Sequence, residues 1–343
     1  MKILICSTLL LLAASCATHN PHIGQAWQVK YGENDPTFSY RVQHQEKDPF
    51  KKLETASEFF TFFSDDTLII GKQGTSVQIY RSCLTYEDGG AVTGPVRIEL
   101  REVFSKSDLI LNNKPTVSDR KLLVSAGALY LNANAGGKNL IITCPEGVAV
   151  SVLRQSTYPG MQVFNGLLNE KGDINWIAEE TAVSENSDTI IYYEEEDYYF
   201  TEEEQTIIQA MGEEDFYEGD TYFNFSASRF GWINCDAFYE DNRPKSNLIV
   251  KISNPLPEDF KSRMFLVFKN MNSVLQVYPT APDQFESPEI PEGEEVLLVC
   301  ISANEKAIFS EIKPLTIKAR QMETIDLRET SEGVLKEKIN GIN

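Results

Sequence analysis

The sequence predicts a mainly β protein with two antiparallel β-sandwich domains joined by an acidic insertion, followed by a short C-terminal helix. Short runs such as Thr75–Tyr80 and Val96–Arg101 alternate apolar and polar residues, a period of two that is typical of strands with one face on a core. Gly, Asn and Pro separate these runs, and no long helical pattern lies between them. Hydrophobic residues make up 42% of the 343 positions, which is enough to fill ordinary cores.

Residues 1–15 have the composition of an export signal. Their apolar run, Ile3–Leu12, is shorter than the roughly 20 residues that span a bilayer as a helix, so we expect a processed signal peptide. Ala13-Ala14-Ser15 precede Cys16, an arrangement that resembles the lipobox of bacterial lipoproteins, with Ala13 where Leu is usual. The resemblance implies that Cys16 is acylated and becomes the first mature residue. The alternative is an ordinary secretory signal that is cut after Ala17.

The residue after Cys16 bears on the location of the mature protein. Ala17 stands where many lipoproteins of the inner membrane have Asp, so the resemblance implies the outer membrane, on its periplasmic or its surface face. No second apolar run is long enough to span a bilayer, so any membrane contact rests on the N-terminal lipid.

Residues 16–60 form a polar lead-in, which we expect to hold a tether and an entry element, and residues 61–176 are expected to form the first sandwich. Gly71–Thr75 is Gly-rich but lacks the spacing of a phosphate-binding loop, so we interpret it as a turn that leads into a strand. The expected strands are Thr75–Tyr80, Val96–Arg101, Lys121–Val124, Ala128–Asn132, Leu140–Cys144 and Ala149–Leu153.

Residues 177–228 are expected to form an acidic, aromatic linker or insertion. Residues 172–228 contain 17 Asp and Glu and no Lys or Arg, so most of the formal net charge of −20 is local to this stretch. Three interpretations are open: a solvated segment extended by its own repulsion, a docking strip for a basic partner, or a loose calcium site without EF-hand spacing. The possible docking strip consists of Tyr192, Tyr193, Glu194, Glu195, Glu196, Asp197, Tyr198 and Tyr199.

Residues 229–330 again contain short, strand-like apolar runs separated by turns, and they are expected to form a second, small Ig-like sandwich. Residues 331–343 are expected to form a helix, because Ser331 can serve as its N-cap and Leu335 and Ile339 lie four residues apart. The expected strands of the second domain are Leu248–Ile252, Met264–Phe268, Val274–Tyr278, Val296–Ile301, Ala307–Ile312, Leu315–Ala319 and Thr324–Leu327.

Four cysteines remain after export: Cys83, Cys144, Cys235 and Cys300. An exported protein can form disulfides, and the domain boundaries favour the pairs Cys83 with Cys144 and Cys235 with Cys300. The alternative is four separate buried thiols. A zinc site is not expected, because no two cysteines are close in sequence.

Several classes of function are excluded or disfavoured. An excess of acids without any basic block argues against nucleic-acid binding. The three histidines, His19, His22 and His44, all lie near the N-terminus, and no Gly-x-Ser-x-Gly elbow occurs, so we expect no catalytic residues, no metal site and no cofactor. Trp176 and Trp232 can stack on sugars if exposed, although we expect Trp232 to pack in a core.

Eight short segments of the first part occur in a characteristic order: Gly71–Thr75, Val92–Val103, Pro115–Ser118, Lys121–Leu123, Ala126–Ala128, Met161–Phe164, Gly172–Trp176 and Gly231–Asp236. Together they resemble a family of uncharacterised envelope lipoproteins of Bacteroidota, and the first part is similar to the ZU5 β-sandwich. The resemblance covers roughly residues 65–240 and implies a cell-envelope location and a β-sandwich fold, without a substrate. Ile290–Glu294 resembles a motif of the small sandwiches that accompany carboxypeptidases, which implies a carboxypeptidase-regulatory-like second domain.

We therefore expect a lipid-anchored outer-membrane protein that is not an enzyme and that acts as a binding or assembly module for a protein partner in the envelope. The alternative is a lipoprotein that binds or processes glycans through exposed aromatic side chains and carboxylates.

Overall fold

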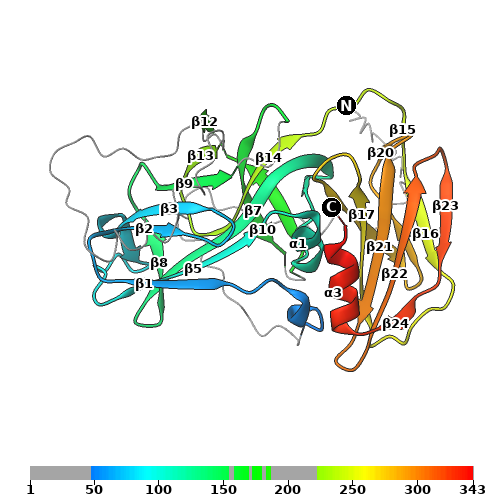
Figure 1. The fold of residues 1–343 in the computed structure, drawn as a ribbon, viewed down its shortest axis with the longest axis horizontal. Helices are drawn as coiled ribbons and strands as arrows, with labels where there is room; N and C mark the ends of the chain where they lie inside the picture. The colour runs from blue at the N-terminus through cyan, green and yellow to red at the C-terminus, as the bar shows by residue number, and fades with distance from the viewer. Residues whose placement is uncertain (1–47, 154–157, 170–171, 180–182, 187–221, 343) are drawn as a thin grey trace, which may run out of the picture. The chain divides into compact units, whose positions relative to one another are not determined.

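The computed structural model describes residues 48–153, 158–169, 172–179, 183–186 and 222–342. The expected signal peptide, Cys16, the tether up to residue 47 and the possible docking strip lie outside these ranges. The described chain is mainly β, with several antiparallel sheets and a short C-terminal helix (Figure 1), so the predicted fold class is confirmed. Within the part that the structure describes, none of the helices is long and apolar enough to cross a membrane.

Two sheets form the first half of the described chain, which we define as residues 48–238. The larger sheet has the order β1 (Glu58–Phe62), β5 (Val96–Val103), β7 (Lys121–Ala135), β14 (Gly231–Phe238), β10 (Gln162–Leu168) and β11 (Ile174–Ala178), with β4 (Leu84–Tyr86), β6 (Val117–Ser118) and β8 (Lys138–Ile142) alongside. The smaller sheet has the order β12 (Ser184–Asn186), β13 (Tyr222–Ala227), β9 (Val148–Leu153), β3 (Ser76–Tyr80) and β2 (Asp66–Ile70).

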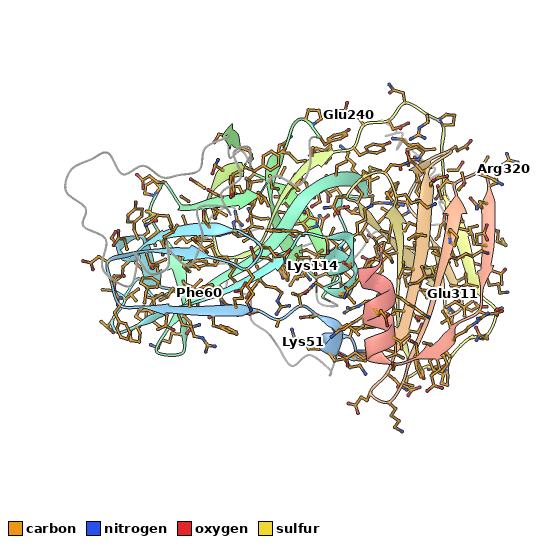
Figure 2. All side chains as sticks on the ribbon, viewed as in Figure 1. Lys51, Phe60, Lys114, Glu240, Glu311 and Arg320 are labelled. Atoms are coloured by element: carbon orange, nitrogen blue, oxygen red, sulfur yellow. A yellow bond between two sulfur atoms is a disulfide. The ribbon has the colours of Figure 1, made fainter. Side chains whose placement is uncertain are left out.

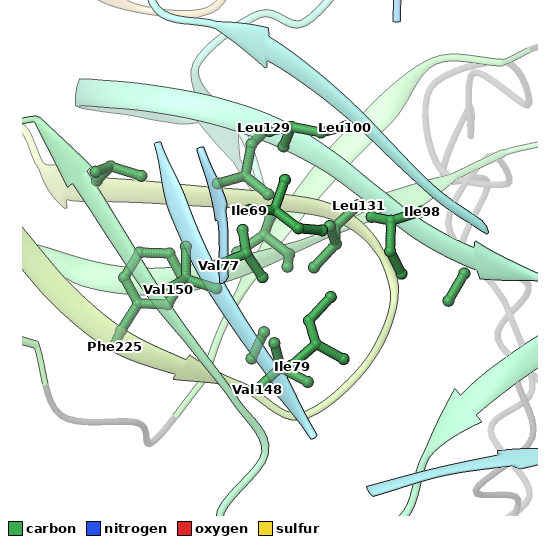
Figure 3. Close-up of a cluster of buried hydrophobic side chains, with 14 of the residues drawn as sticks. Ile69, Val77, Ile79, Ile98, Leu100, Leu129, Leu131, Val148, Val150 and Phe225 are labelled. Atoms are coloured by element: carbon green, nitrogen blue, oxygen red, sulfur yellow. The ribbon is translucent and has the colours of Figure 1, made fainter. Parts of the chain in front are cut away.

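A hydrophobic core lies between these two sheets (Figure 3). Alternate residues of each strand point inward, so Ile69, Val77 and Val150 of the smaller sheet meet Ile98 and Leu100 of the larger one. This alternation is the pattern that the sequence shows, and it explains why the strands are predictable.

The expected strands Lys121–Val124 and Ala128–Asn132 are one continuous strand, β7. The break in the apolar pattern corresponds to a bulge opposite Cys235 and Asp236. Gly127 has a φ of 129° there, and a Cβ atom would lie 2.2 Å from Cδ1 of Phe104, so only glycine fits.

The second half, residues 245–342, has an eight-stranded sheet and a two-stranded sheet. The larger has the order β23 (Gln321–Ile325), β16 (Leu248–Ile252), β19 (Gln284–Glu286), β18 (Val274–Ala281), β17 (Lys261–Phe268), β21 (Glu295–Ala303), β22 (Ile308–Thr316) and β24 (Arg328–Thr330), while β15 (Lys245–Ser246) pairs with β20 (Ile290–Pro291). The expected strands Ala307–Ile312 and Leu315–Ala319 merge into β22. Strands β16 and β23 pair in parallel.

The helices of the described residues are short. They are α3 (Glu332–Asn340), α1 (Lys106–Leu111) and the 3-10 turns η1 (Lys51–Leu53) and η2 (Arg81–Cys83). The predicted C-terminal helix is confirmed as α3, and the Ser331 hydroxyl accepts a hydrogen bond from the backbone N–H of Val334. Helix α1 is not predicted from the sequence, although Ser105 and Asp108 form a capping box at its start.

The sequence places residues 229–238 in the second sandwich, but β14 lies in the larger sheet of the first half, paired with β7 and β10. Its buried inward residues Ile233, Cys235 and Ala237 complete the first core. The expected boundary is wrong because strand order depends on contacts between distant segments, which local patterns do not reveal.

The acidic residues 187–221 connect β12 to β13, which are neighbours in the smaller sheet, with Asn186 opposite Tyr222. The acidic stretch is therefore an insertion within the first half. The connection between the two halves is made by residues 239–244.

The two halves share a second hydrophobic cluster, which we call the shared core. It joins Leu53 and Leu109 of the first half to Phe265 of the second half and to Leu335 and Ile339 of α3. Backbone hydrogen bonds also cross, from the N–H of Thr116 to the carbonyl of Val274 (2.8 Å) and from the N–H of Ser125 to the carbonyl of Asn272 (2.9 Å). Contacts of this kind indicate that the halves stabilise one another.

Candidate functional site

Cys83 and Cys144 form a disulfide with Cα atoms 4.7 Å apart, as the sequence predicts. The predicted pairing of Cys235 with Cys300 is wrong. Cys235 belongs to the core of the first half and Cys300 to a separate core of the second half, so the two sulfur atoms face different interiors. Burial raises the pKa of the Cys300 thiol to about 12, which keeps it protonated and unreactive.

The two tryptophans considered for sugar stacking are both buried. Trp176 donates a hydrogen bond from Nε1 to the carbonyl of Pro115 (2.8 Å). Trp232 packs against Tyr130, with ring centroids 5.4 Å apart, and Nζ of Lys114 lies 4.4 Å from its ring. Core packing of Trp232 is thus confirmed, and neither side chain is positioned to stack on a glycan.

Two buried ionisable groups would be candidates for chemistry if a ligand could reach them. Burial lowers the pKa of Lys114, which lies near α1 (Figure 2), to about 7, and burial raises the pKa of Asp236 well above its usual value. Surface hollows of about 530 and 390 Å³ are lined mainly by residues of the second half, with Lys52 of the first half at the larger one, and neither is lined by Lys114 or Asp236. Among the described residues, no group of three or more His, Cys, Asp or Glu is placed to hold a metal ion.

Asp236 gives the first testable prediction. Its carboxyl accepts a hydrogen bond from Nδ2 of Asn234 (2.6 Å), and burial raises its pKa well above that of the unfolded chain, so between the two pKa values the folded chain keeps a proton that the unfolded chain has lost. The folded state then binds more protons, so the free energy of unfolding falls as pH rises, by about 1.4 kcal/mol per pH unit up to the raised pKa. Asp236→Asn should remove this slope in urea titrations from pH 5 to 8. The exposed Asp66→Asn should keep it, and parallel curves for Asp236→Asn and wild type would contradict the assignment.

The open side of the first half is the feature that best supports a function. Among the strands that the structure describes, β1 is terminal in the larger sheet and β2 in the smaller one. Only residues 63–65 join them, so the two sheet edges lie close together. Phe60 in Figure 2 marks the position of β1.

Exposed apolar side chains concentrate in the stretch of sequence from β1 to β3. Among the described residues, five of the seven large hydrophobic side chains that are exposed come from the stretch between β1 and β3. They are Phe59 (53% exposed), Phe63 (75%), Leu68 (47%), Ile70 (46%) and Tyr80 (48%). Such a concentration in one short stretch is typical of an interaction surface.

β2 lacks the features that commonly protect a sheet edge. Its sequence, Asp66–Ile70, contains no Lys or Pro, and its register with β3 is continuous, without a bulge. Three other terminal strands in the described sheets differ. β12 is short, with three residues. On β23, the carbonyl of Thr324 is approached by Nζ of Lys313 at 3.5 Å. On β1, the Glu58 carboxylate accepts a hydrogen bond from the backbone N–H of Lys72 (3.1 Å).

The hydrogen-bond pattern shows which backbone groups of β2 are open. Backbone bonds from Gly71 to Thr75 (2.8 Å) and from Arg81 to Asp65 (2.6 Å) flank the pair of β2 and β3. Because bonded and non-bonded residue pairs alternate in an antiparallel ladder, odd-numbered residues of β2 bond to β3. The N–H and C=O groups of Leu68 and Ile70 therefore face the open edge, whereas the carbonyl of Asp66 accepts the Ser64 hydroxyl (2.5 Å).

The turn after β2 holds this strand in place. The buried Glu102 carboxylate accepts the backbone N–H groups of Gln73 (2.8 Å) and Thr75 (3.0 Å). A Cβ atom on Gly71 would lie 2.7 Å from this carboxylate, so glycine permits the close approach. The turn predicted from Gly71–Thr75 is confirmed, and it anchors β2 to β5 of the opposite sheet.

Of the site residues predicted from the sequence, the structure brings together Cys83 and Cys144 and separates Cys235 from Cys300. The open edge of β2 is not predicted, and no strand is predicted at Asp66–Ile70, whose apolar residues Leu68, Ile69 and Ile70 are consecutive. No protein-family model matches the chain, and no curated protein matches it.

Proposed function

We propose that the protein is a lipid-anchored outer-membrane protein that acts as a non-catalytic binding or assembly module for a protein partner in the envelope. The observation that carries this proposal is the open edge of β2, where Leu68 and Ile70 expose both their side chains and their backbone hydrogen-bonding groups. Edges of this kind recruit extended segments of other proteins.

The placement in the envelope has separate support. The residues before Cys16 resemble a lipobox, and a disulfide between Cys83 and Cys144 suits a compartment outside the cytoplasm. The resemblance of the first half to Bacteroidota envelope lipoproteins agrees with that placement. Metabolic labelling with a palmitate analogue should mark the wild type and not Cys16→Ser, and equal labelling of both would refute the anchor.

Affinity capture from detergent-solubilised membranes tests the binding function. The wild type should retain a partner in stoichiometric amount, and the pair Leu68→Lys with Ile70→Lys should lose it, because two buried ammonium groups would oppose docking. Met322→Lys, at an apolar residue of β23 that is 64% exposed, is the matched control and should retain the partner.

A further variant separates the open edge from the acidic insertion. Asn186 and Tyr222 are directly opposite, so a short Asn-Gly turn can replace residues 188–220 without disturbing the sheet. Capture that persists in this variant would show that the partner does not need the docking strip Tyr192–Tyr199. Absence of any stoichiometric partner of the wild type would contradict the proposed function, and selective binding to a glycan array would then favour the alternative function.

A further inference from the structure

The chemistry of β2 indicates what kind of segment its edge accepts, and this inference rests on the proposed function. Its outward side chains, in chain order, are Asp66, Leu68 and Ile70, and all three are exposed. Asp65 and Asp66 both lie at the start of the strand with exposed carboxylates, and neither belongs to an ion pair within the described ranges. The edge therefore presents one acidic position followed by two apolar positions.

The orientation of an added strand follows from the rest of the sheet. Every pair in the smaller sheet is antiparallel: β2 with β3, β3 with β9, β9 with β13 and β13 with β12. An antiparallel strand at the open edge would continue this pattern. It would bond to the N–H and C=O groups of both Leu68 and Ile70, and its side chains opposite these residues would lie on the same outer face.

We infer that β2 accepts an extended segment of a partner protein as an additional antiparallel strand, in which an apolar residue opposite Ile70 is followed at alternate positions by an apolar residue opposite Leu68 and a Lys or Arg opposite Asp66. The order is set by the antiparallel direction, because the partner runs from Ile70 towards Asp66. Its basic side chain would neutralise the acidic end of β2, and the two apolar side chains would cover the exposed apolar pair.

Three acetylated and amidated peptides of equal length test this inference against the full chain by fluorescence polarisation. The first, Thr-Val-Thr-Val-Thr-Lys-Thr, has the inferred order. The second is its reverse, with the same composition, and the third carries Glu in place of Lys. The first peptide should bind roughly five-fold more tightly than the other two, or better. A difference of this size corresponds to about one net hydrogen bond or ion pair at a partly desolvated site.

Two variants test the backbone and the charge separately. The N–H of Leu68 faces the open edge, so Leu68→Pro removes a donor to the partner without removing a bond to β3, and it should weaken the first peptide by roughly five-fold. Asp66→Lys should reverse the preference, so that the Glu peptide binds more tightly than the Lys peptide. Met322→Lys should change neither affinity. If Leu68→Pro does not fold, the Asp66→Lys reversal alone decides the matter.

Equal binding of the three peptides, or an unchanged preference in Asp66→Lys, would overturn the inference. A dimer of the chain that depends on Leu68 in sedimentation would also overturn it, since a second copy would then occupy the edge. These results are distinguishable from failure of the proposed function. If membranes yield a stoichiometric partner that Leu68→Pro and Asp66→Lys both retain, the binding function holds and the partner docks elsewhere.

Discussion

Replacing Cys83 and Cys144 by Ser is expected to lower the free energy of unfolding by about 4 kcal/mol, because the disulfide closes a loop with a sequence separation of 61 residues and restricts the unfolded chain. Urea titration at neutral pH measures the change. The reduced wild type is the matched control and should show the same loss. A loss below about 1 kcal/mol in both samples would show that the pairing of β4 with β8 already holds the two segments together in the unfolded ensemble.

The second large effect is expected from α3. Leu335 is fully buried in the shared core, whereas Val334, its neighbour on the same helix, is 45% exposed. Leu335→Ala should therefore destabilise the protein by roughly 2–5 kcal/mol, and Val334→Ala by less than about 1 kcal/mol.

The Leu335→Ala variant also tests whether the halves are coupled. Because the shared core contains residues of both halves, hydrogen exchange should accelerate in β5 and β7 as well as in β17 and β21. Faster exchange in the second half alone would show that the first half keeps its stability independently.

Much of the fold can be predicted because its signals are local. Alternation of apolar and polar residues marks strands such as β3, β5 and β16, and Ser331 with Leu335 and Ile339 marks α3. Gly71–Thr75 is identifiable as a turn because glycine permits a backbone that other residues resist. In each case the residues that form the feature lie within about ten positions of one another.

The errors arise where the structure depends on distant contacts. The pairing of β14 with β7 and β10 decides that residues 231–238 belong to the first half, and no local pattern contains that pairing. The face on which a cysteine lies also depends on the sheet to which its strand belongs, so Cys235 and Cys300 are buried in separate cores. The capping box at Ser105 is a local signal for α1, but six residues are too few to produce a helical period.

The open edge of β2 belongs to the same class of non-local features. Whether a strand is terminal depends on which other strands pair with it, and Asp66–Ile70 lacks the alternation that marks the predicted strands, so neither the strand nor its edge is predicted. The sequence does contain three consecutive apolar residues here, and the structure buries Ile69 while it exposes Leu68 and Ile70 on the opposite face. In a strand with one solvated face, polar residues are usual at those positions.

Site-specific photocrosslinking in living cells tests most directly whether the edge of β2 binds a partner. Leu68→p-benzoylphenylalanine places the reactive group on the open edge, and Met322→p-benzoylphenylalanine places it on an exposed residue of the second half. We predict one crosslinked partner protein of defined mass from position 68 and none from position 322. No crosslink from position 68, or the same products from both positions, would contradict the account.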